Sequence, residues 1–311
     1  MSAGERVAAL AVALAVDGVV GEVGGSGHPV ALAGWLLEEA YRPWRGRSPG
    51  LELAGGAAAL AGVATLAAAL AWAFERRAGR GPLRAVLAGL LLKQTFSVRR
   101  LLEEGGGVAD ALERGAIDVA RRRLGALVSR PTADLDAELC ASAAIESLAE
   151  NVGDSVAAPL LLYAAFGLPA AAAYRVVNTA DAMFGYHGET EWLGKAAARL
   201  DDLLNWVPSR LSALAVTGAG LVLGGARGAW RTWLREGGRT ASPNAGRPMA
   251  AMAGALGRRL EKPDHYVLGE GLPGPGPADV RAAVRLAGVA SALLAAGALA
   301  LAALRGGGGR R

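Results

Sequence analysis

The sequence predicts an all-α, polytopic integral membrane protein. Of its 311 residues 52% are hydrophobic, and the mean hydropathy is +0.29. A soluble domain seldom reaches such values, because it must keep a charged shell in water. Charged residues still make up 20% of the chain, but they lie between long apolar stretches, and no useful length alternates like a β-strand. We therefore expect about four to five transmembrane helices, together with amphipathic or re-entrant helices.

Four segments approach the roughly 20 apolar residues that a helix needs to cross a bilayer. They are residues 7–23, 53–74, 207–225 and 284–304. A fifth apolar segment, 155–177, contains Pro159 and a Gly-Leu-Pro break at 167–169. Each half is too short to span, so we expect this segment to be re-entrant or kinked.

The remaining stretches are polar or amphipathic. Residues 83–92 pass into Lys93 and two arginines, which indicates an amphipathic, interfacial helix. The polar loops 75–154 and 226–280 carry charged stretches with helical periodicity. We expect a single membrane-embedded catalytic domain over residues 1–311.

Arginine supplies almost all of the positive charge, since only three lysines occur and the net charge is +5. Basic residues between apolar runs are typical of cytoplasmic loops, which favours a multi-pass protein of the bacterial inner membrane over a nucleic-acid binder. The loops after the second span and before the last span are both arginine-rich. Both can be cytoplasmic only if an even number of crossings separates them, and the sequence leaves open whether 155–177 and 207–225 both cross or neither does. The single cysteine, Cys140, excludes an intramolecular disulfide.

The first candidate site is an acidic stripe. Glu146, Glu150 and Asp154 recur every four residues, so on a helix they share one face. Like charges in this register repel unless a cation or arginines compensate them. Carboxylate oxygens suit Mg²⁺, which usually brings phosphate with it. The alternative is a solvated acidic face beside an arginine-rich loop.

A second candidate cluster lies at the end of the broken apolar segment. Asn178 and Asp181 are three residues apart on one helical face, and Arg175 adds a cation one turn earlier. Polar groups at the edge of a membrane segment are costly and therefore indicate function. The alternative is an interfacial helix end with side chains that reach toward water.

The third candidate cluster follows shortly after. Asp201, Asp202 and Asn205 can hold a divalent ion, and Arg199 and Arg210 can bind phosphate or carboxylate through a bidentate fork. Three such clusters lie within about sixty residues, each next to an apolar run, and together they predict one metal–phosphate site. No phosphate-binding P-loop, zinc-ligand spacing or Gly-x-Ser-x-Gly motif is present in the sequence.

Motifs along nearly the whole chain are similar to those of the adenosylcobinamide-phosphate synthase family of cobalamin biosynthesis. They occur in collinear order: Asp17 with HPV (28–30), LKQTFSVR (92–99), LVSR (127–130), IESLAEN (145–151), YRVVNT (174–179), ARLDD (198–202), SPNAG (242–246) and MAAMAGALG (249–257). Three positions depart from the family pattern. Pro131 stands where the family has aspartate, Arg247 where it has tryptophan, and Ser155 where glycine is common.

The resemblance implies an ATP-dependent amide ligation. The propionate carboxylate of adenosylcobyric acid would join (R)-1-aminopropan-2-ol or its O-phosphate, with ATP and Mg²⁺ as cofactors and other membrane enzymes of late cobalamin assembly as possible partners. It assigns Mg²⁺ binding and amine deprotonation to Glu146, Glu150, Asp154, Asp201 and Asp202. The expected phosphate- and substrate-binding residues are Lys93, Arg99, Arg130, Asn151, Arg175, Asn178, Asp181, Arg199, Asn205 and Arg210.

Two other functions remain open from the residues alone. Residues 201–205 are similar to the Asp-rich motif with which membrane prenyltransferases bind diphosphate, although residues 178–181 are a poor second copy. A secondary transporter would also combine membrane carboxylates with a broken helix. Against a transporter, most charges lie at segment ends, and no inverted repeat is visible.

Overall fold

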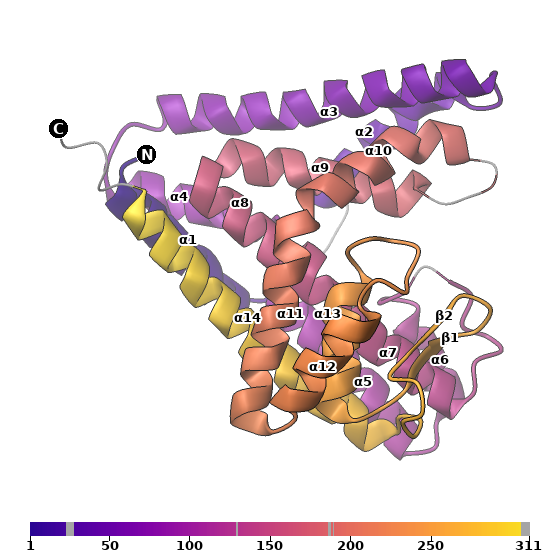
Figure 1. Cartoon of the computed structure of the whole chain (residues 1–311). Helices are drawn as coiled ribbons and strands as arrows, with labels where there is room; N and C mark the ends of the chain where they lie inside the picture. The colour runs from indigo at the N-terminus through magenta and orange to yellow at the C-terminus, as the bar shows by residue number, and fades with distance from the viewer. Residues whose placement is uncertain (23–27, 129, 186–187, 189, 306–311) are drawn as a thin grey trace. The chain divides into compact units, whose positions relative to one another are not determined.

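The computed structural model describes residues 1–22, 28–128, 130–185, 188 and 190–305 (Figure 1). Val23, at the end of the first predicted span, and Ser129, in the 127–130 motif, lie outside the described residues. The regular elements of the described chain are helices apart from one short hairpin, which confirms the all-α class. Its contacts group into two compact units, each built from discontinuous segments. The single domain predicted for residues 1–311 stays a prediction.

The first unit comprises residues 1–97, 158–204 and the end of the chain from 297. Its helices are α1 (Ala3–Val19), α2 (Pro29–Tyr41), a 3₁₀ turn (Arg42–Trp44), α3 (Pro49–Arg77), α4 (Pro82–Lys93), α8 (Ala158–Phe166), α9 (Leu168–Phe184) and α10 (Glu191–Leu204). The long helix α3 packs on α9 and α10. Their core includes the stacked rings of Tyr41 and Phe184, whose centroids are 4.4 Å apart.

Helices α1 and α4 form a close pair within this unit. A Cβ atom added at Gly89 would lie 2.6 Å from the Ala9 carbonyl oxygen, so only glycine allows this approach. Glu5 and Asp17 of α1 form ion pairs with Arg84 and Lys93 of α4 respectively, so the two helices run in the same direction.

The second unit comprises residues 98–157 and 205–296. Its elements are α5 (Val98–Glu113), α6 (Ile117–Leu124), α7 (Ala137–Asn151), a π-helix (Val152–Ala157), α11 (Trp206–Leu223), α12 (Ala226–Glu236), α13 (Gly246–Leu256) and most of α14 (Pro277–Leu304). Strands β1 (Leu260–Lys262) and β2 (Tyr266–Leu268) pair antiparallel, with Glu261 opposite Val267. This hairpin is too short to show in the sequence as alternation.

Within the described residues, three helices are long and apolar enough to cross a membrane: α3, α11 and α14. They correspond to three of the five predicted spans. The first predicted span becomes the 17-residue helix α1, which ends at Val19. The segment 155–177 is broken as expected, because Gly167 adopts a φ of 90° between α8 and α9. The Leu168 amide that this break frees donates to Glu75 of α3 at 3.1 Å.

Candidate functional site

Helix α7 carries Glu146 and Glu150 of the first acidic cluster, and its local sequence explains where the helix begins and how it lies. Asp136 caps the helix by accepting the Leu139 amide at 2.8 Å, which satisfies one of the first-turn donors. Residues 140–149 are all buried, so α7 is enclosed by the second unit rather than exposed along a face. The polar side chains on α7 must therefore find partners inside the unit.

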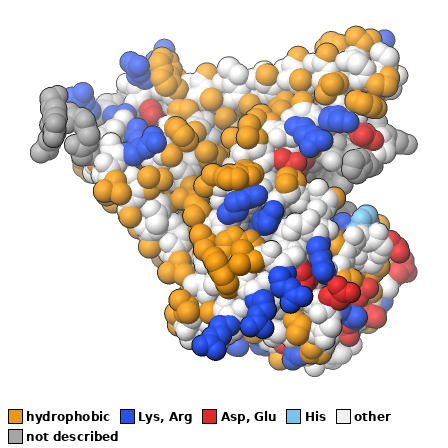
Figure 2. Space-filling model, in the orientation of Figure 1, with side chains coloured by type: hydrophobic (Ala, Val, Ile, Leu, Met, Phe, Trp, Pro, Cys, Tyr) orange, Lys and Arg blue, Asp and Glu red, His pale blue; other side chains and the backbone are white. Residues whose placement is uncertain are grey.

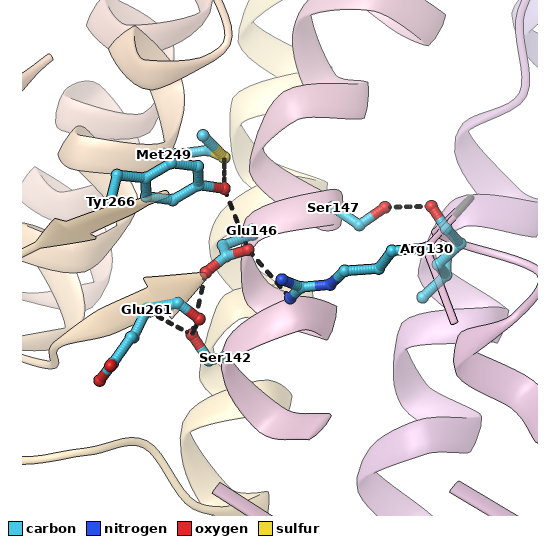
Figure 3. A network of polar contacts seen from close by, with 8 residues as sticks. Arg130, Ser142, Glu146, Ser147, Met249, Glu261 and Tyr266 are labelled. Carbon is cyan, nitrogen blue, oxygen red and sulfur yellow. Dashed lines mark hydrogen bonds and ion pairs between the residues drawn. The ribbon is translucent and has the colours of Figure 1, made fainter. Parts of the chain in front are cut away.

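Glu146 is at the centre of a buried polar network (Figure 3). Its Oε1 accepts from the Ser142 hydroxyl at 3.0 Å, and its Oε2 accepts from the Tyr266 hydroxyl at 3.2 Å and from Arg130 at 3.4 Å. Ser142 also accepts the Glu261 amide at 2.7 Å. The network thus fastens the β1–β2 hairpin and the segment before α7 to the same turn of α7.

Burial raises the pKa of the Glu146 carboxyl, and Arg130, Ser142 and Tyr266 partly oppose this shift because they stabilise the ionised form. The pKa of Tyr266 is raised by burial and by the carboxylates Glu146 and Glu150. The phenol therefore stays protonated near neutral pH and acts as a donor to Glu146. Both oxygens of Glu146 are engaged by protein donors, which suits a residue that organises the site.

A second row of polar contacts continues from α7 into the π-helix. Ser147 donates to the Leu127 carbonyl at 2.7 Å, and Asn151 donates to the Ser147 carbonyl at 3.0 Å. Ser155 in turn donates to the Asn151 amide oxygen at 2.8 Å. The π-helix that carries Asp154 follows directly, and such widened turns occur frequently at functional sites. Glu150 and Asp154 are half-buried, unlike Glu146.

Basic groups of the second unit lie at this cluster and at the start of α11. Arg130 pairs with Glu146, and Lys262 lies near enough to lower the pKa of that carboxyl. Arg210 donates to the Asn244 side-chain oxygen at 3.3 Å, and the buried Ser209 hydroxyl reaches the same atom. The π-helix packs on α11 beside Ser209. One unit therefore combines carboxylates on α7 and the π-helix with arginines that can bind anions.

The first unit brings the second predicted cluster together with Asp201 of the third, whereas Asn205 and Arg210 of the third cluster belong to the second unit. Arg175 donates to the Asn178 side-chain oxygen at 3.1 Å, and Asn178 donates to Asp201 at 3.3 Å. Asp201 is buried where α9 and α10 pack, whereas Asp181 and Asp202 are half-buried.

The other predicted residues are placed as follows. Lys93 forms a buried ion pair with Asp17 at 3.2 Å in the first unit. Arg99 pairs with Glu103 at 2.6 Å on the surface of α5, Arg199 is exposed on α10, and Asn205 is buried just before α11. Among the described residues, no group of three His, Cys, Asp or Glu side chains could hold a metal ion. The five-carboxylate Mg²⁺ site stays a prediction.

A cavity of 290 Å³ opens in the first unit between α2, α3, α4 and α9. Its lining is mainly apolar, with Gln94, Thr95 and Arg175 as its polar groups. Ligand sites commonly combine an apolar wall with a few polar groups in this way, although this volume lies just below the usual range of about 300–1,000 Å³.

Sequence reasoning did not find Ser142, Tyr266 and Glu261 as partners of Glu146. Tyr266 is 120 residues from Glu146 in the chain. Ser142 carries a local signal, because it lies four residues before Glu146 and so on the same face of α7.

The comparisons with known proteins give a consistent result. A family model described as CobD/Cbib protein matches residues 10–293. A protein named probable cobalamin biosynthesis protein CobD from Methanothermobacter thermautotrophicus is 48% identical over 61% of this chain and 64% of its own length. A protein named cobalamin biosynthesis protein CobD from Chromobacterium violaceum is 39% identical over 96% of this chain and 97% of its own length. A protein named probable cobalamin biosynthesis protein CobD from Pyrococcus furiosus is 40% identical over 83% of this chain and 86% of its own length. No solved structure matches.

Proposed function

The chain belongs to the CobD/Cbib family of cobalamin biosynthesis, and we propose that it is the ATP-dependent ligase expected from its motifs. Its substrates would be adenosylcobyric acid and (R)-1-aminopropan-2-ol or the O-phosphate of that amine, and its product the corresponding cobinamide amide. The observation that carries this proposal is the cluster in the second unit, where half-buried carboxylates follow a fixed Glu146–Arg130 pair. Glu146 and Glu150 lie in the IESLAEN motif, and the whole cluster lies within the residues that the family model matches.

Amide ligation requires that the protein activate the substrate carboxylate and remove a proton from the attacking amine. A carboxylate is a poor acyl donor at neutral pH, so its oxygen must first be converted to a leaving group, here by phosphorylation with ATP. Arg130 and Arg210 would neutralise the substrate carboxylate and the transferring phosphoryl group. Glu150 or Asp154 would accept the proton of the attacking amine, because their half-buried carboxylates remain accessible.

The carboxylates of the second unit match the ligands that Mg²⁺ usually has in phosphoryl-transfer sites. Mg²⁺ is commonly held by one or two carboxylates together with substrate phosphates and water, rather than by a complete protein cage. Whichever of Glu150 and Asp154 does not accept the amine proton would supply such a carboxylate to the ion. The oxygens of Glu146 accept from Ser142, Tyr266 and Arg130. The ion would neutralise charge on the transferring phosphoryl group.

The test is direct. The purified full-length protein in detergent is incubated with the corrinoid acid, either amine, ATP and Mg²⁺, and the corrinoid mass is followed. We expect the mass increase of an amide only when ATP is present, and a severe loss of rate in Glu150→Gln and Asp154→Asn. Glu138→Gln is the matched control, because Glu138 is exposed at the start of the same helix and pairs with Arg259 on the surface. Absence of an ATP-dependent product with both amines would exclude this function.

A further inference from the structure

Helix α12 presents a row of arginines on the surface of the second unit. Arg227, Arg231 and Arg235 are four residues apart, so they lie one above another on one face, and all three are exposed. Trp230 and Leu234 are exposed beside them, at 45% and 60%. The opposite face, which includes Ala229 and Trp233, is buried. The exposed arc of α12 is therefore half basic and half apolar.

These three arginines have no acidic partner within the described ranges of the chain, where ion pairs are otherwise frequent in this unit. Arg239, Arg258, Arg259 and Arg281 each pair with a carboxylate. Like charges at a spacing of four residues on a helix repel each other by a few tenths of a kcal/mol per pair. A bound anion would remove this repulsion.

A groove runs beside this row between α12 and α11. Its volume is 520 Å³, and it is lined by Thr217 and Leu221 of α11 together with the arginines, Trp230 and Leu234. Figure 2 shows blue side chains in a diagonal row beside a large orange area on the second unit. The groove thus offers an apolar wall and a cationic edge to the same occupant.

The position of the groove along α11 indicates which occupant it meets. Helix α11 is a candidate membrane span that ends at Leu223, and Gly224 and Gly225 reverse the chain with positive φ angles before α12 begins. From Thr217 to Leu223 the helix rises by about 9 Å. This is the depth to which interfacial helices commonly enter the boundary between headgroups and acyl chains.

We propose that this groove binds an anionic phospholipid. The phosphate of the headgroup lies against Arg227, Arg231 and Arg235, which can bind phosphate through planar, bidentate hydrogen bonds. An acyl chain lies along Leu221, Trp230 and Leu234. A zwitterionic lipid is disfavoured, because its ammonium group meets the arginine row. The site is separate from the ligase chemistry and does not depend on it.

Trp230 provides the probe, because it lines the groove itself. The full-length protein is placed in phosphatidylcholine vesicles with a small, equal fraction of either brominated phosphatidylglycerol or brominated phosphatidylcholine. Bromine quenches tryptophan emission only at short range, and Trp230→Phe identifies the part of the signal that comes from Trp230. We expect stronger quenching by brominated phosphatidylglycerol. Each Arg→Gln change should lower this preference roughly fivefold, as expected for one basic side chain at an anionic surface.

The matched control removes three exposed arginines elsewhere, in the variant Arg114→Gln/Arg122→Gln/Arg285→Gln. We expect it to keep the lipid preference, and a triple Arg→Lys variant of the groove to keep part of it. Equal quenching by both lipids, or an equal loss in the control variant, would overturn the proposal. If inorganic phosphate abolishes the preference at unchanged ionic strength, the groove takes soluble phosphate instead, which also overturns it.

Discussion

Substitution of Glu146 tests how the second unit holds its polar core. In Glu146→Ala, three donors lose their acceptor: Ser142, Tyr266 and Arg130. The Arg130 side chain is only 18% exposed and that of Glu146 7%, so water cannot fully replace the lost contacts. In Glu146→Gln, the amide oxygen can still accept from Tyr266 and Arg130. Ser142 can then rotate to accept from the new NH₂ group.

The expected losses in the free energy of unfolding differ between the alanine and glutamine variants. Breaking a buried pair by removing one partner costs about 3–5 kcal/mol, because the other group is left without a partner. The glutamine variant keeps acceptors for Tyr266 and Arg130 and should lose only about 1 kcal/mol. Tyr266→Phe in the alanine background removes one of the unpaired donors, so it should cost less there than in the wild-type protein.

The measurement is the free energy of unfolding of the purified protein in detergent, followed by tryptophan fluorescence during denaturant titration. Glu103→Ala is the matched control. Glu103 and Arg99 form a pair of similar chemistry on the surface, with side chains 53% and 41% exposed, so the loss should stay within about 1 kcal/mol. If Glu146→Ala and Glu103→Ala lowered the free energy of unfolding by the same amount, the buried network around Glu146 would not stabilise the fold more than a surface ion pair does.

The contribution of Glu146 to the free energy of unfolding should decrease as the pH rises. Because burial raises the folded-state pKa of Glu146 above its value of 4.5 in the unfolded chain, the protonated carboxyl favours the folded state. This contribution is complete below about pH 4.5 and is lost as the pH rises through the folded-state pKa. The stability of the wild-type protein relative to Glu146→Gln should therefore decrease as the pH rises. A relative stability that increases with pH would contradict the raised pKa.

Three further predictions concern packing and mechanism. Lys93→Met should destabilise the first unit by about 3–5 kcal/mol, because Asp17 is left buried without its cation, and Asp17→Leu in the same chain should restore most of this loss in the same unfolding titration. Gly89→Val should separate α1 from α4, since its Cβ would lie 2.6 Å from the Ala9 carbonyl oxygen, and a thermal midpoint equal to that of the wild type would contradict this packing. If the ligase works through an acyl phosphate, ¹⁸O from the corrinoid carboxylate should appear in inorganic phosphate, and label in AMP would instead indicate an acyl adenylate.

Part of the candidate site could be predicted from the sequence. The four-residue spacing of Glu146 and Glu150 places both on α7, and the three-residue spacing of Arg175 and Asn178 gives a hydrogen bond on α9. The hydrogen bond from Asn178 to Asp201 could not be predicted from the sequence, because it depends on how α9 packs against α10. Equally, no spacing rule distinguishes the buried Glu146 from the half-buried Glu150 one turn later.

The sequence by itself determined the all-α class, the apolar segments of α3, α11 and α14, and the break at Gly167, because hydropathy and helical periodicity depend on neighbouring residues. Only the tertiary structure decided that Tyr266, on a short hairpin, donates to a carboxylate 120 residues earlier in the chain. Such a pairing depends on which helix faces pack together. Burial then raises the pKa of Glu146, and neither this shift nor the long-range pairing can be found from local spacing.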